Sequence, residues 1–479
     1  MLFSLLISVL ILLLIVLTAK TLMQRKTPLP CTESREVERD AHAEQALCNA
    51  ITCRTISHED GEETDWSAFS ALQQYIGQTY TLCETHRITD ADLGPHNLLY
   101  RFEGKDASCE PAMLTAHLDV VGAADEAWSH PPFSGVLEDG FVWGRGSFDC
   151  KLQVITILEA FEDLLKRGEN MQRTWYVAFG CDEECNASTE GAVRIAAWLA
   201  NHKVHLSLVL DEGGVVSQNY IKGFKQDIAV IGVAEKGYLD LELSVVREAG
   251  HSSTPSFPTA LGTLSRGLAR LERHQMRPYL TTPVRTMLKS LGEQGPFAYS
   301  LLFLNPGLFK LILFSVFSKN PTLNALIRTT VVPTVVSASD KSNVIALEAK
   351  AQVNIRLLCN QTKEEAVAWV KRTLADPSIH ITVVRHTPPS PVSRTDTEVF
   401  ASLKKTILAT FPEALVTPYL MLGATDARKY QGICDQIFRF TPARMDRSEI
   451  GRMHAPDERI SCANIALAKQ FYTRLISSY

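Results

Sequence analysis

The fold is decided by a stretch at residues 111–122 that reads PAMLTAHLDVVG. Its apolar run predicts a buried strand, and the polar residues His117 and Asp119 stand where that strand gives way to a loop. Two similar strand runs follow, each preceded by a run of helical periodicity. In chain order these are LQVITILEAFEDLLKRG (152–168), TWYVAFG (174–180), GAVRIAAWLANHK (191–203) and LSLVLDEGG (206–214). Strands that alternate with helices predict an α/β domain with a mostly parallel sheet.

The pattern changes near Ala234, where the residues YLDLELSVV (238–246) alternate as in a half-exposed antiparallel strand. The order that follows, helix, two strands, helix and strand, indicates a smaller α+β domain of ferredoxin-like type inserted into the first. We therefore predict a catalytic domain in two parts, 46–233 and 389–479, an inserted domain at 234–388, a tether at 27–45 and an N-terminal segment at 1–26.

The N-terminal segment is an almost unbroken apolar run from Leu2 to Ala19. At about 1.5 Å per residue it spans roughly 27 Å, barely the thickness of a bilayer core. We predict an uncleaved membrane anchor, with a signal peptide and a secreted enzyme as the alternative. Lys20, Arg25 and Lys26 follow the run and would favour a cytoplasmic body by the positive-inside rule, so the side stays open. An extracytoplasmic body is our expectation.

A second apolar stretch, PFAYSLLFLNPGLFKLILFSVF (296–317), has Lys310 as its only charge and Pro306–Gly307 in its middle. Each half is too short to span a bilayer. Burial within the inserted domain is the expected outcome. The alternative is a surface that dips into a membrane or binds an acyl chain.

The bulk composition excludes several classes of protein. The 479 residues carry a net charge of −5, so nothing predicts a nucleic-acid partner. The 11 cysteines form no CxxC pair, which argues against a cysteine-based zinc finger.

Acidic and histidine side chains gather where the predicted strands and turns end. They are His117, Asp119, Asp149, Glu183, Glu184, Asp211 and, near the C-terminus, His454. Ligands of open α/β sheets bind beyond the carboxyl ends of the strands. Neighbouring carboxylates repel one another unless cations lie between them. Mixed histidine and carboxylate ligands are typical of zinc, with manganese or cobalt as substitutes, so the sequence predicts a metal site there.

Ten motifs occur in the order found in one zinc metallopeptidase family. They are HLDVV (117–121), WSHPPFSG (128–135), DGFVWGRGSFDCK (139–151), DEE (182–184), LDEGG (210–214), AEKGYLDL (234–241), GHSSTP (250–255), NVI (343–345), GATDAR (423–428) and HAPDE (454–458). From about residue 45 to the end, the chain resembles this family, which includes carboxypeptidase S, aminoacylase-1, glutamate carboxypeptidase and succinyl-diaminopimelate desuccinylase. It is most similar to the branch of carboxypeptidase S and the N-fatty-acyl-amino-acid synthase/hydrolases.

The resemblance implies two zinc ions per chain, bridged by Asp149. The implied ligands are His117, Asp149, Glu184, Asp211 and His454. Glu183 would be the general base, and Asp119 would fix the tautomer and orientation of His117. Cys150 stands where relatives often have Asp, and the resemblance implies a cis peptide bond before it. An alternative role for the Cys150 thiol is that of a further metal ligand.

The inserted domain would supply residues to the substrate, often after it closes over the site as a lid. The resemblance points to His251 for the oxyanion and to Asn343 and Arg356 for a substrate carboxylate, which a guanidinium can bind with two hydrogen bonds. Gly423, Thr425 and Asp426 of the GATDAR motif would line the same cleft. In several relatives the inserted domain also forms a homodimer.

The predicted function is hydrolysis of an amide whose amine side is an amino acid with a free carboxylate. A peptide substrate would make the enzyme a carboxypeptidase, and an acyl group would make it an N-acyl-amino-acid hydrolase. The alternative from another class is a metal-free binding or receptor module that has kept the fold.

Overall fold

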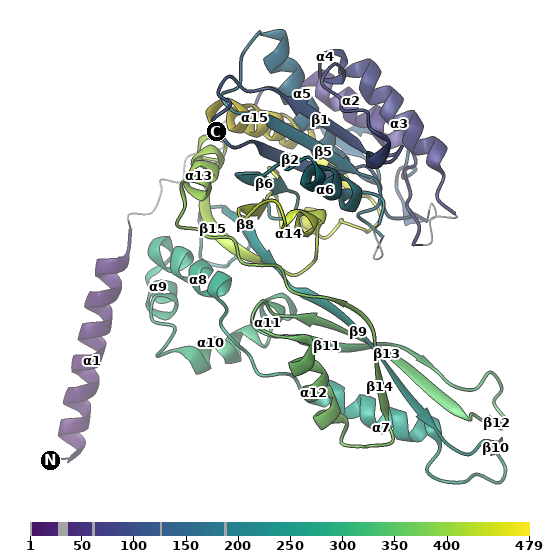
Figure 1. Cartoon of the computed structure of the whole chain (residues 1–479). Coiled ribbons are helices and arrows are strands. Elements are labelled where there is room, and N and C mark those ends of the chain that lie inside the picture. The colour runs from purple at the N-terminus through teal and green to yellow at the C-terminus, as the bar shows by residue number, and fades with distance from the viewer. Residues whose placement is uncertain (1, 27–36, 60–62, 125–126, 186–188) are drawn as a thin grey trace.

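The computed structural model describes residues 2–26, 37–59, 63–124, 127–185 and 189–479. Figure 1 shows two bodies, each built on its own sheet, with the second projecting away from the first. Most of the predicted tether lies outside the described residues. Helix α2 (Ala41–Thr52) begins inside the predicted tether, because Asp40 caps it by accepting a hydrogen bond from the Ala43 amide.

The larger sheet is mostly parallel at its centre, which confirms the predicted fold class. Strand β2 pairs in parallel with both β5 and β6, β6 with β16, and β8 with β15. Strand β1 adds an antiparallel edge. The sheet order is β1 (Leu98–Phe102), β5 (Trp175–Gly180), β2 (Ala112–His117), β6 (Leu208–Asp211), β16 (Ile437–Arg439), β8 (Ile228–Glu235), β7 (Val216–Ser217) and β17 (Arg444–Met445), with β15 (Leu415–Met421) beside β8.

Both faces of this sheet are covered, because successive side chains of its strands point to opposite sides. Leu114 and Leu210 face one core, and their neighbours Met113 and Val209 face the other. The helices over the first face are α2, α5 (Lys151–Lys166), α13 (Glu398–Thr410) and α15 (Cys462–Ser478), and those over the second are α6 (Ala192–Asn201) and η3 (Asp426–Tyr430).

The smaller body is an antiparallel sheet with helices on one face, as predicted for the inserted segment. Strand β9 alternates buried and partly exposed residues, with Leu239, Leu241 and Leu243 in the core. The sheet order is β11 (Thr330–Ser337), β13 (Glu348–Leu357), β9 (Gly237–Val246) and β14 (His380–Thr387), and the helices are α7 (Ala260–Arg273) and α12 (Lys363–Leu374). We call this body the lid. Its far tip is a two-stranded pair, β10 (Gly250–His251) and β12 (Val344–Ile345).

Four helices between α7 and β11 pack against β8 and β15 of the larger sheet. They are α8 (Thr282–Gln294), α9 (Phe297–Phe303), α10 (Lys310–Phe317) and α11 (Pro321–Ile327). The expected burial of residues 296–317 is only half right. Leu313 and Phe317 are buried in this cluster, whereas Leu311 is 81% exposed, because α10 lies across the surface and only one of its faces meets the core.

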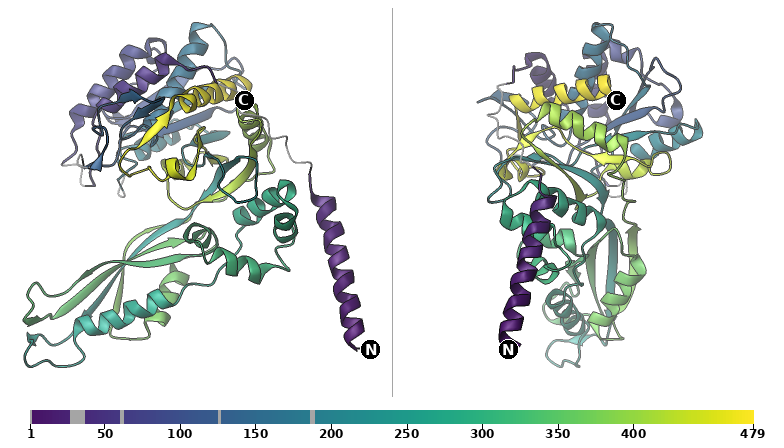
Figure 2. Two further views of the ribbon diagram at one scale, coloured as in Figure 1. Left: turned by 180° about the vertical axis from the view of Figure 1, so that it is seen from behind. Right: turned by 90° about the vertical axis from the view of Figure 1, so that its left-hand side faces the viewer.

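Helix α1 (Leu2–Gln24) lies beside α9, as the three views of Figures 1 and 2 agree. No helix within the described residues has the length and apolar character that a membrane span requires. The remaining elements are α3 (Trp66–Thr79), α4 (Thr81–Glu84), η1 (Ala91–Leu93), β3 (Val136–Glu138), β4 (Phe141–Trp143), α14 (Arg447–Ile450) and β18 (Arg459–Ser461).

Candidate metal centre

The site lies at the carboxyl ends of the central strands. His117 is the last residue of β2 and pairs with Gly180, the last residue of β5, so Glu183 and Glu184 follow within one turn of it. Strand β6, on the other side of β2, ends at Asp211. Three adjacent parallel strands therefore deliver acidic and histidine side chains to one edge of the sheet, as the sequence pattern predicts.

Asp149 lies at the centre of the cluster, between two histidines. Its Oδ1 is 3.1 Å from Nε2 of His117, and its Oδ2 is 3.1 Å from Nε2 of His454. Burial opposes ionisation of Asp149, but its bonds to His117 and His454 dominate and hold its pKa well below the usual range. Each carboxylate oxygen thus faces a different imidazole, which is the arrangement of a carboxylate that bridges two cations.

Two glutamates complete the two halves of the cluster. Glu184 Oε1 is 3.2 Å from His454 Nε2, and Glu212 Oε1 is 3.6 Å from His117 Nε2. His117, Asp149, Cys150 and Glu212 form one group of potential ligand atoms within 4.8 Å of one another, and Asp149, Glu184 and His454 form another.

Asp211, a ligand implied by the resemblance, contacts backbone amides in this structure. Its Oδ1 accepts the Glu212 amide at 2.8 Å and its Oδ2 accepts the Ala427 amide at 2.7 Å, so backbone donors engage both oxygens. Asp211 joins none of the ligand groups among the described residues, and the next residue, Glu212, lies there instead. Adjacent residues at a strand end face opposite ways, and the sequence does not say which of the two faces the site.

Asp119 connects the histidine to the two glutamates. His117 Nδ1 is 2.9 Å from the Asp119 backbone oxygen and 3.3 Å from its Oδ1, which leaves Nε2 to face Asp149. The same carboxylate accepts the amide of Glu183 at 3.1 Å and that of Glu184 at 3.0 Å. Ser57 donates to it at 2.6 Å. This fully buried carboxylate therefore fixes both the imidazole and the turn that carries the glutamates.

In contrast to Asp149, the three glutamates of the cluster have raised pKa values, mainly because they are buried. The pKa of Glu183 is raised well above its usual range by burial, which outweighs the nearby His117. Burial also raises the pKa of Glu184 and of Glu212, the latter with Asp149 adding to it. Carboxyl groups that are held together despite burial and mutual repulsion are typical of a site that binds cations.

Glu458 holds the loop that carries Asp149, and the sequence analysis assigned it no role. Its Oε1 accepts the amides of Gly146 and Phe148 at 3.0 Å and of Asp149 at 3.2 Å, while Oε2 pairs with Arg145 at 2.5 Å. Burial raises its pKa to about 7. Its place in HAPDE, four residues after His454, is the signal that could have indicated a role.

The same loop shows two further features expected from the sequence. Gly146 has φ +85°, and a Cβ there would lie 2.8 Å from Val120, so the backbone approaches its neighbour as only glycine allows. The predicted cis peptide bond between Asp149 and Cys150 is confirmed. The Cys150 thiol is fully buried and accepts the His117 amide at 3.1 Å.

Asp182, the first residue of the DEE motif, binds backbone amides at the start of α6. Its carboxylate accepts the amides of Thr189, Glu190 and Gly191 at 2.8–2.9 Å, at the start of α6. Only two of the three consecutive acidic residues therefore face the metal cluster.

Residues of the GATDAR motif (423–428) contact the buried carboxylates of Glu235 and Asp211. Thr425 donates to Glu235 Oε1 at 2.8 Å, and Asp426 is buried with no hydrogen-bond partner for its Oδ2 among the described residues. Burial and the neighbouring Asp211 raise the pKa of Asp426 well above its usual range. Gly423 is exposed in the preceding turn, with open space where a side chain would begin.

Arg356 stands on β13 in the part of the lid next to the larger body. Its guanidinium lies over the Tyr238 ring, 4.6 Å from the centroid. Lys236, just before β9, is buried, and its pKa falls to about 7 through burial, with Arg356 adding to it. The half-buried Arg356 thus keeps a positive charge close to the junction of the two bodies.

The structure does not bring His251 and Asn343 to the metal cluster. The two meet at the lid tip, where β10 pairs with β12 and the Asn343 carbonyl accepts the Ser252 amide at 3.1 Å. His251 is exposed, and its Nδ1 is 2.8 Å from Ser253 Oγ. Figure 1 places this tip at the far end of the lid from β2 and β6.

The donor set fits divalent metal ions. Two imidazole nitrogens and three carboxylates converge, and mixed nitrogen and oxygen ligands with a shared carboxylate are what a pair of zinc-like ions requires. The fold and the site therefore define the class of hydrolytic metalloenzymes with a parallel-sheet catalytic domain and a lid.

The chain belongs to the peptidase family M20/M25/M40, whose family model matches residues 113–478. It is 35% identical to the human N-fatty-acyl-amino acid synthase/hydrolase PM20D1 over 95% of this chain and 91% of that protein. It is also 35% identical to the probable carboxypeptidase S-like 2 of Dictyostelium discoideum over 92% of this chain and 85% of that protein. The resemblance stated from the motifs, and the prediction of an enzyme of metallopeptidase or amidohydrolase type, are confirmed.

Solved structures show the same fold. The M20 family metallo-carboxypeptidase Sso-CP2 from Sulfolobus solfataricus matches 91% of this chain and 99% of its own, with a TM-score of 0.67 and 18% identity. Human carnosine dipeptidase 1 covers 91% of this chain and 96% of its own, with a TM-score of 0.58 and 15% identity.

Proposed function

We propose that the chain hydrolyses amides whose amine side is an amino acid with a free carboxylate, at a centre that holds two zinc ions. The observation that carries the proposal is the position of Asp149, whose two oxygens each lie 3.1 Å from a different histidine. One ion would be held by His117, Asp149 and Glu212, and the other by Asp149, Glu184 and His454. When bound, the ions supply Lewis acidity to the scissile carbonyl and to the attacking water.

Glu183 is the proposed general base. Its backbone amide donates to Asp119, it stands beside the proposed ligand Glu184, and burial raises its pKa, which favours acceptance of a proton. It would take the proton of the attacking water and deliver it to the leaving amine nitrogen. Asp119 holds His117 in the tautomer that leaves Nε2 free to bind metal.

Recognition of the free carboxylate is proposed for the cationic junction at Arg356. The support is a guanidinium close to the larger body, which would face a substrate bound between the cluster and the lid. A role for His251 and Asn343 would need the lid tip to approach the cluster, or a second chain to supply them. We propose both residues as substrate contacts under one of these two conditions. We also propose that the chain forms a homodimer through the lid.

The acyl side of the substrate is either a peptide or a fatty acid. The relatives named as N-fatty-acyl-amino acid hydrolases favour the lipid amide, and those named as carboxypeptidases favour the peptide. Assaying N-oleoyl-phenylalanine beside a blocked dipeptide separates the two, and no turnover of the lipid amide would remove that option.

The reaction itself is tested with Glu183→Gln. We expect turnover to fall by a factor of about 10²–10⁴, the usual contribution of a general base, while the metal content stays that of the wild type. The matched control is Glu190→Gln on the same loop, whose carboxylate pairs with Arg194 at the surface. A near-normal rate in Glu183→Gln would show that the role is wrongly assigned. The rival reading, a metal-free binding module, predicts no turnover in any variant.

A further inference from the structure

Two neighbouring helices expose apolar side chains that no described part of the chain covers. On α10 and the turn before it, Leu311 is 81% exposed and Leu308, Ile312 and Val316 are each at least half exposed. On α1, a continuous run from Ile11 to Val16 is 44–62% exposed. Contiguous apolar surfaces of this kind mark interaction sites, because water does not favour them.

Residues 1–26 and the helices from α8 to α10 carry an excess of basic residues, although the whole chain carries −5. Residues 1–26 and 282–320 contain seven basic residues and one acidic residue, Glu293. The seven are Lys20, Arg25, Lys26, Arg285, Lys289, Lys310 and Lys319. Glu293 is already paired with Lys26 at 2.6 Å. Apolar side chains ringed by cations match the hydrocarbon edge and the headgroups of an anionic lipid layer.

Specific contacts make α1 part of this surface. Asn305 donates to Thr21 Oγ1 at 3.1 Å in a fully buried contact, the Lys26 amide donates to the Glu293 carbonyl at 2.8 Å, and Arg25 donates to the Gly295 carbonyl at 3.0 Å. These bonds hold the C-terminal end of α1 against α8 and the turn after α9. We call α1, α8, α9 and α10 together the basic-apolar platform.

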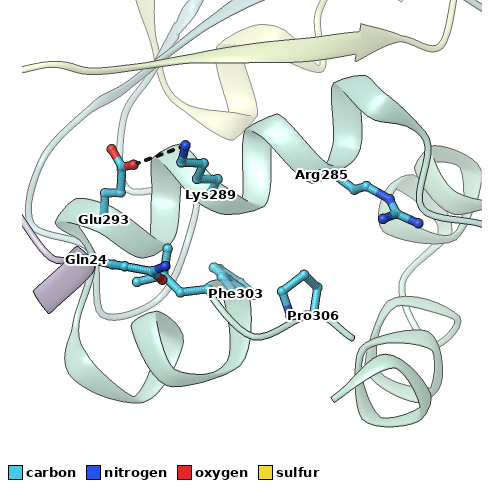
Figure 3. A pocket seen from close by; sticks show the side chains of 7 residues that line it. Gln24, Arg285, Lys289, Glu293, Phe303 and Pro306 are labelled. Atoms are coloured by element: carbon cyan, nitrogen blue, oxygen red, sulfur yellow. Dashed lines mark ion pairs between the residues drawn. The ribbon is translucent and has the colours of Figure 1, made fainter. Parts of the chain in front are cut away.

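A pocket of about 390 Å³ opens within the platform, between the end of α1 and helices α8 and α9. Figure 3 shows Arg285, Lys289 and Glu293 of α8 on one side and Phe303 and Pro306 on the other, with Gln24 of α1 beside them. Glu293 lies 4.0 Å from Lys289, so Arg285 is the cation of this pocket without an acidic partner among its lining residues. A cation above apolar side chains fits a phosphate or carboxylate headgroup whose chains continue along them.

We propose that the basic-apolar platform docks the enzyme on an anionic lipid bilayer. Leu308, Leu311 and Ile312 enter the boundary between headgroups and acyl chains, and Arg285 and Lys289 contact the headgroups. This docking is independent of the proposed reaction, because no residue of the platform belongs to the metal cluster.

The test is flotation of the full-length chain with vesicles of phosphatidylcholine containing roughly a third phosphatidylserine, an anionic fraction that attracts basic segments. We expect the wild type to float with these vesicles and to bind pure phosphatidylcholine vesicles at least fivefold less. Leu311→Asp/Ile312→Asp and Arg285→Glu/Lys289→Glu should each lower flotation at least fivefold.

The matched controls are Leu347→Asp, an equally exposed apolar residue of the lid, and Lys371→Glu/Arg372→Glu, two exposed cations of α12. Both should float like the wild type. All variants should keep wild-type turnover of a water-soluble N-acyl amino acid, which separates failed docking from failed folding or chemistry. Equal binding to neutral vesicles or unaffected platform variants would overturn the proposal.

Discussion

Asp211 and Glu212 are adjacent, but their carboxylates do different things. Asp211 receives two backbone amides, and Glu212 faces His117. We expect Glu212→Gln to lose one of the two metal ions, because an amide is a far weaker zinc ligand than a carboxylate. Asp211→Asn should keep the metal content and lose stability. Mass spectrometry of bound metal measures the first, and urea unfolding the second.

Asp211→Asn is the matched control for Glu212→Gln, because it makes the same carboxylate-to-amide change one residue away. Loss of an ion from Asp211→Asn, with Glu212→Gln retaining both, would restore the assignment made from the sequence and contradict the geometry.

Glu458 acts on the centre without facing it. Glu458→Gln keeps the shape of the side chain but weakens the three amide bonds and the Arg145 pair that fix the Asp149 loop. Replacing a residue that orients a metal ligand lowers metal affinity by about 10–100-fold, and we expect that range here. Competition with a fluorescent zinc chelator measures it. Glu449→Gln, which loses a surface pair with Arg459, should leave the affinity unchanged.

At the scale of residues, the sequence predicted where the cluster lies better than it predicted which residues belong to it. His117, Asp149 and Glu184 each follow a strand or a glycine-rich turn, a pattern visible in the chain, whereas His454 joins them from a segment without that pattern. Glu212 and Glu458 were missed for different reasons. Strand alternation cannot tell Asp211 from Glu212 at a strand end, and the role of Glu458 depends on a loop more than 300 residues away in the chain.

Among the elements, strand β8 carries the connection from the larger sheet into the lid, and a buried ionic network fixes its end. Glu235 Oε1 is 2.7 Å from Arg439 Nε, and its Oε2 is 3.2 Å from Arg428 Nε, with almost no exposure of Glu235 or Arg439. Glu235→Ala leaves two buried cations uncompensated, which costs about 3–5 kcal/mol.

Chemical unfolding should therefore show a loss of about 3 kcal/mol or more for Glu235→Ala. The matched change on the next strand is Glu242→Ala, which loses only a partly exposed pair with Lys350 and should cost under about 1 kcal/mol. Similar values for the two variants would mean that the network does not support β8.

The elements themselves follow closely from the sequence. Apolar runs bounded by polar turns became β2, β5 and β6, and the helical periods became α5 and α6, because in each case one pattern dominates a long window. Residues 296–317 could not be read in the same way. They are apolar all round, so the sequence cannot say that Leu313 packs inward while Leu311 points out.

At the scale of the whole molecule, metal binding should be linked to pH. Bonds to Asp149 and Glu184 raise the pKa of His454 to about 10 in the metal-free chain, so at pH 7 its imidazole is protonated. A metal binds the neutral ring and must displace that proton, so apparent affinity rises with pH, by ~10-fold per pH unit for one proton, up to the pKa.

Calorimetry in two buffers of different ionisation enthalpy counts the released protons. At pH 7 we expect at least one proton per chain, and fewer as the pH approaches 10. Zinc binding at pH 7 without proton release would contradict the pairing of His454 with Asp149 and Glu184.

The position of the lid relative to the larger body could not be predicted from the sequence. His251 and Asn343 come together as the motifs suggest, but at a tip far from the cluster. Their distance from the metals depends on the backbone near Lys236, where β8 passes into β9, and no local pattern encodes that angle.

The measurement that tests the central claim most directly is the metal content of the purified full-length chain after equilibration with excess zinc and removal of free ions. A centre bridged by Asp149, with His117 on one side and His454 on the other, predicts two zinc ions per chain. One ion or fewer per chain would contradict it.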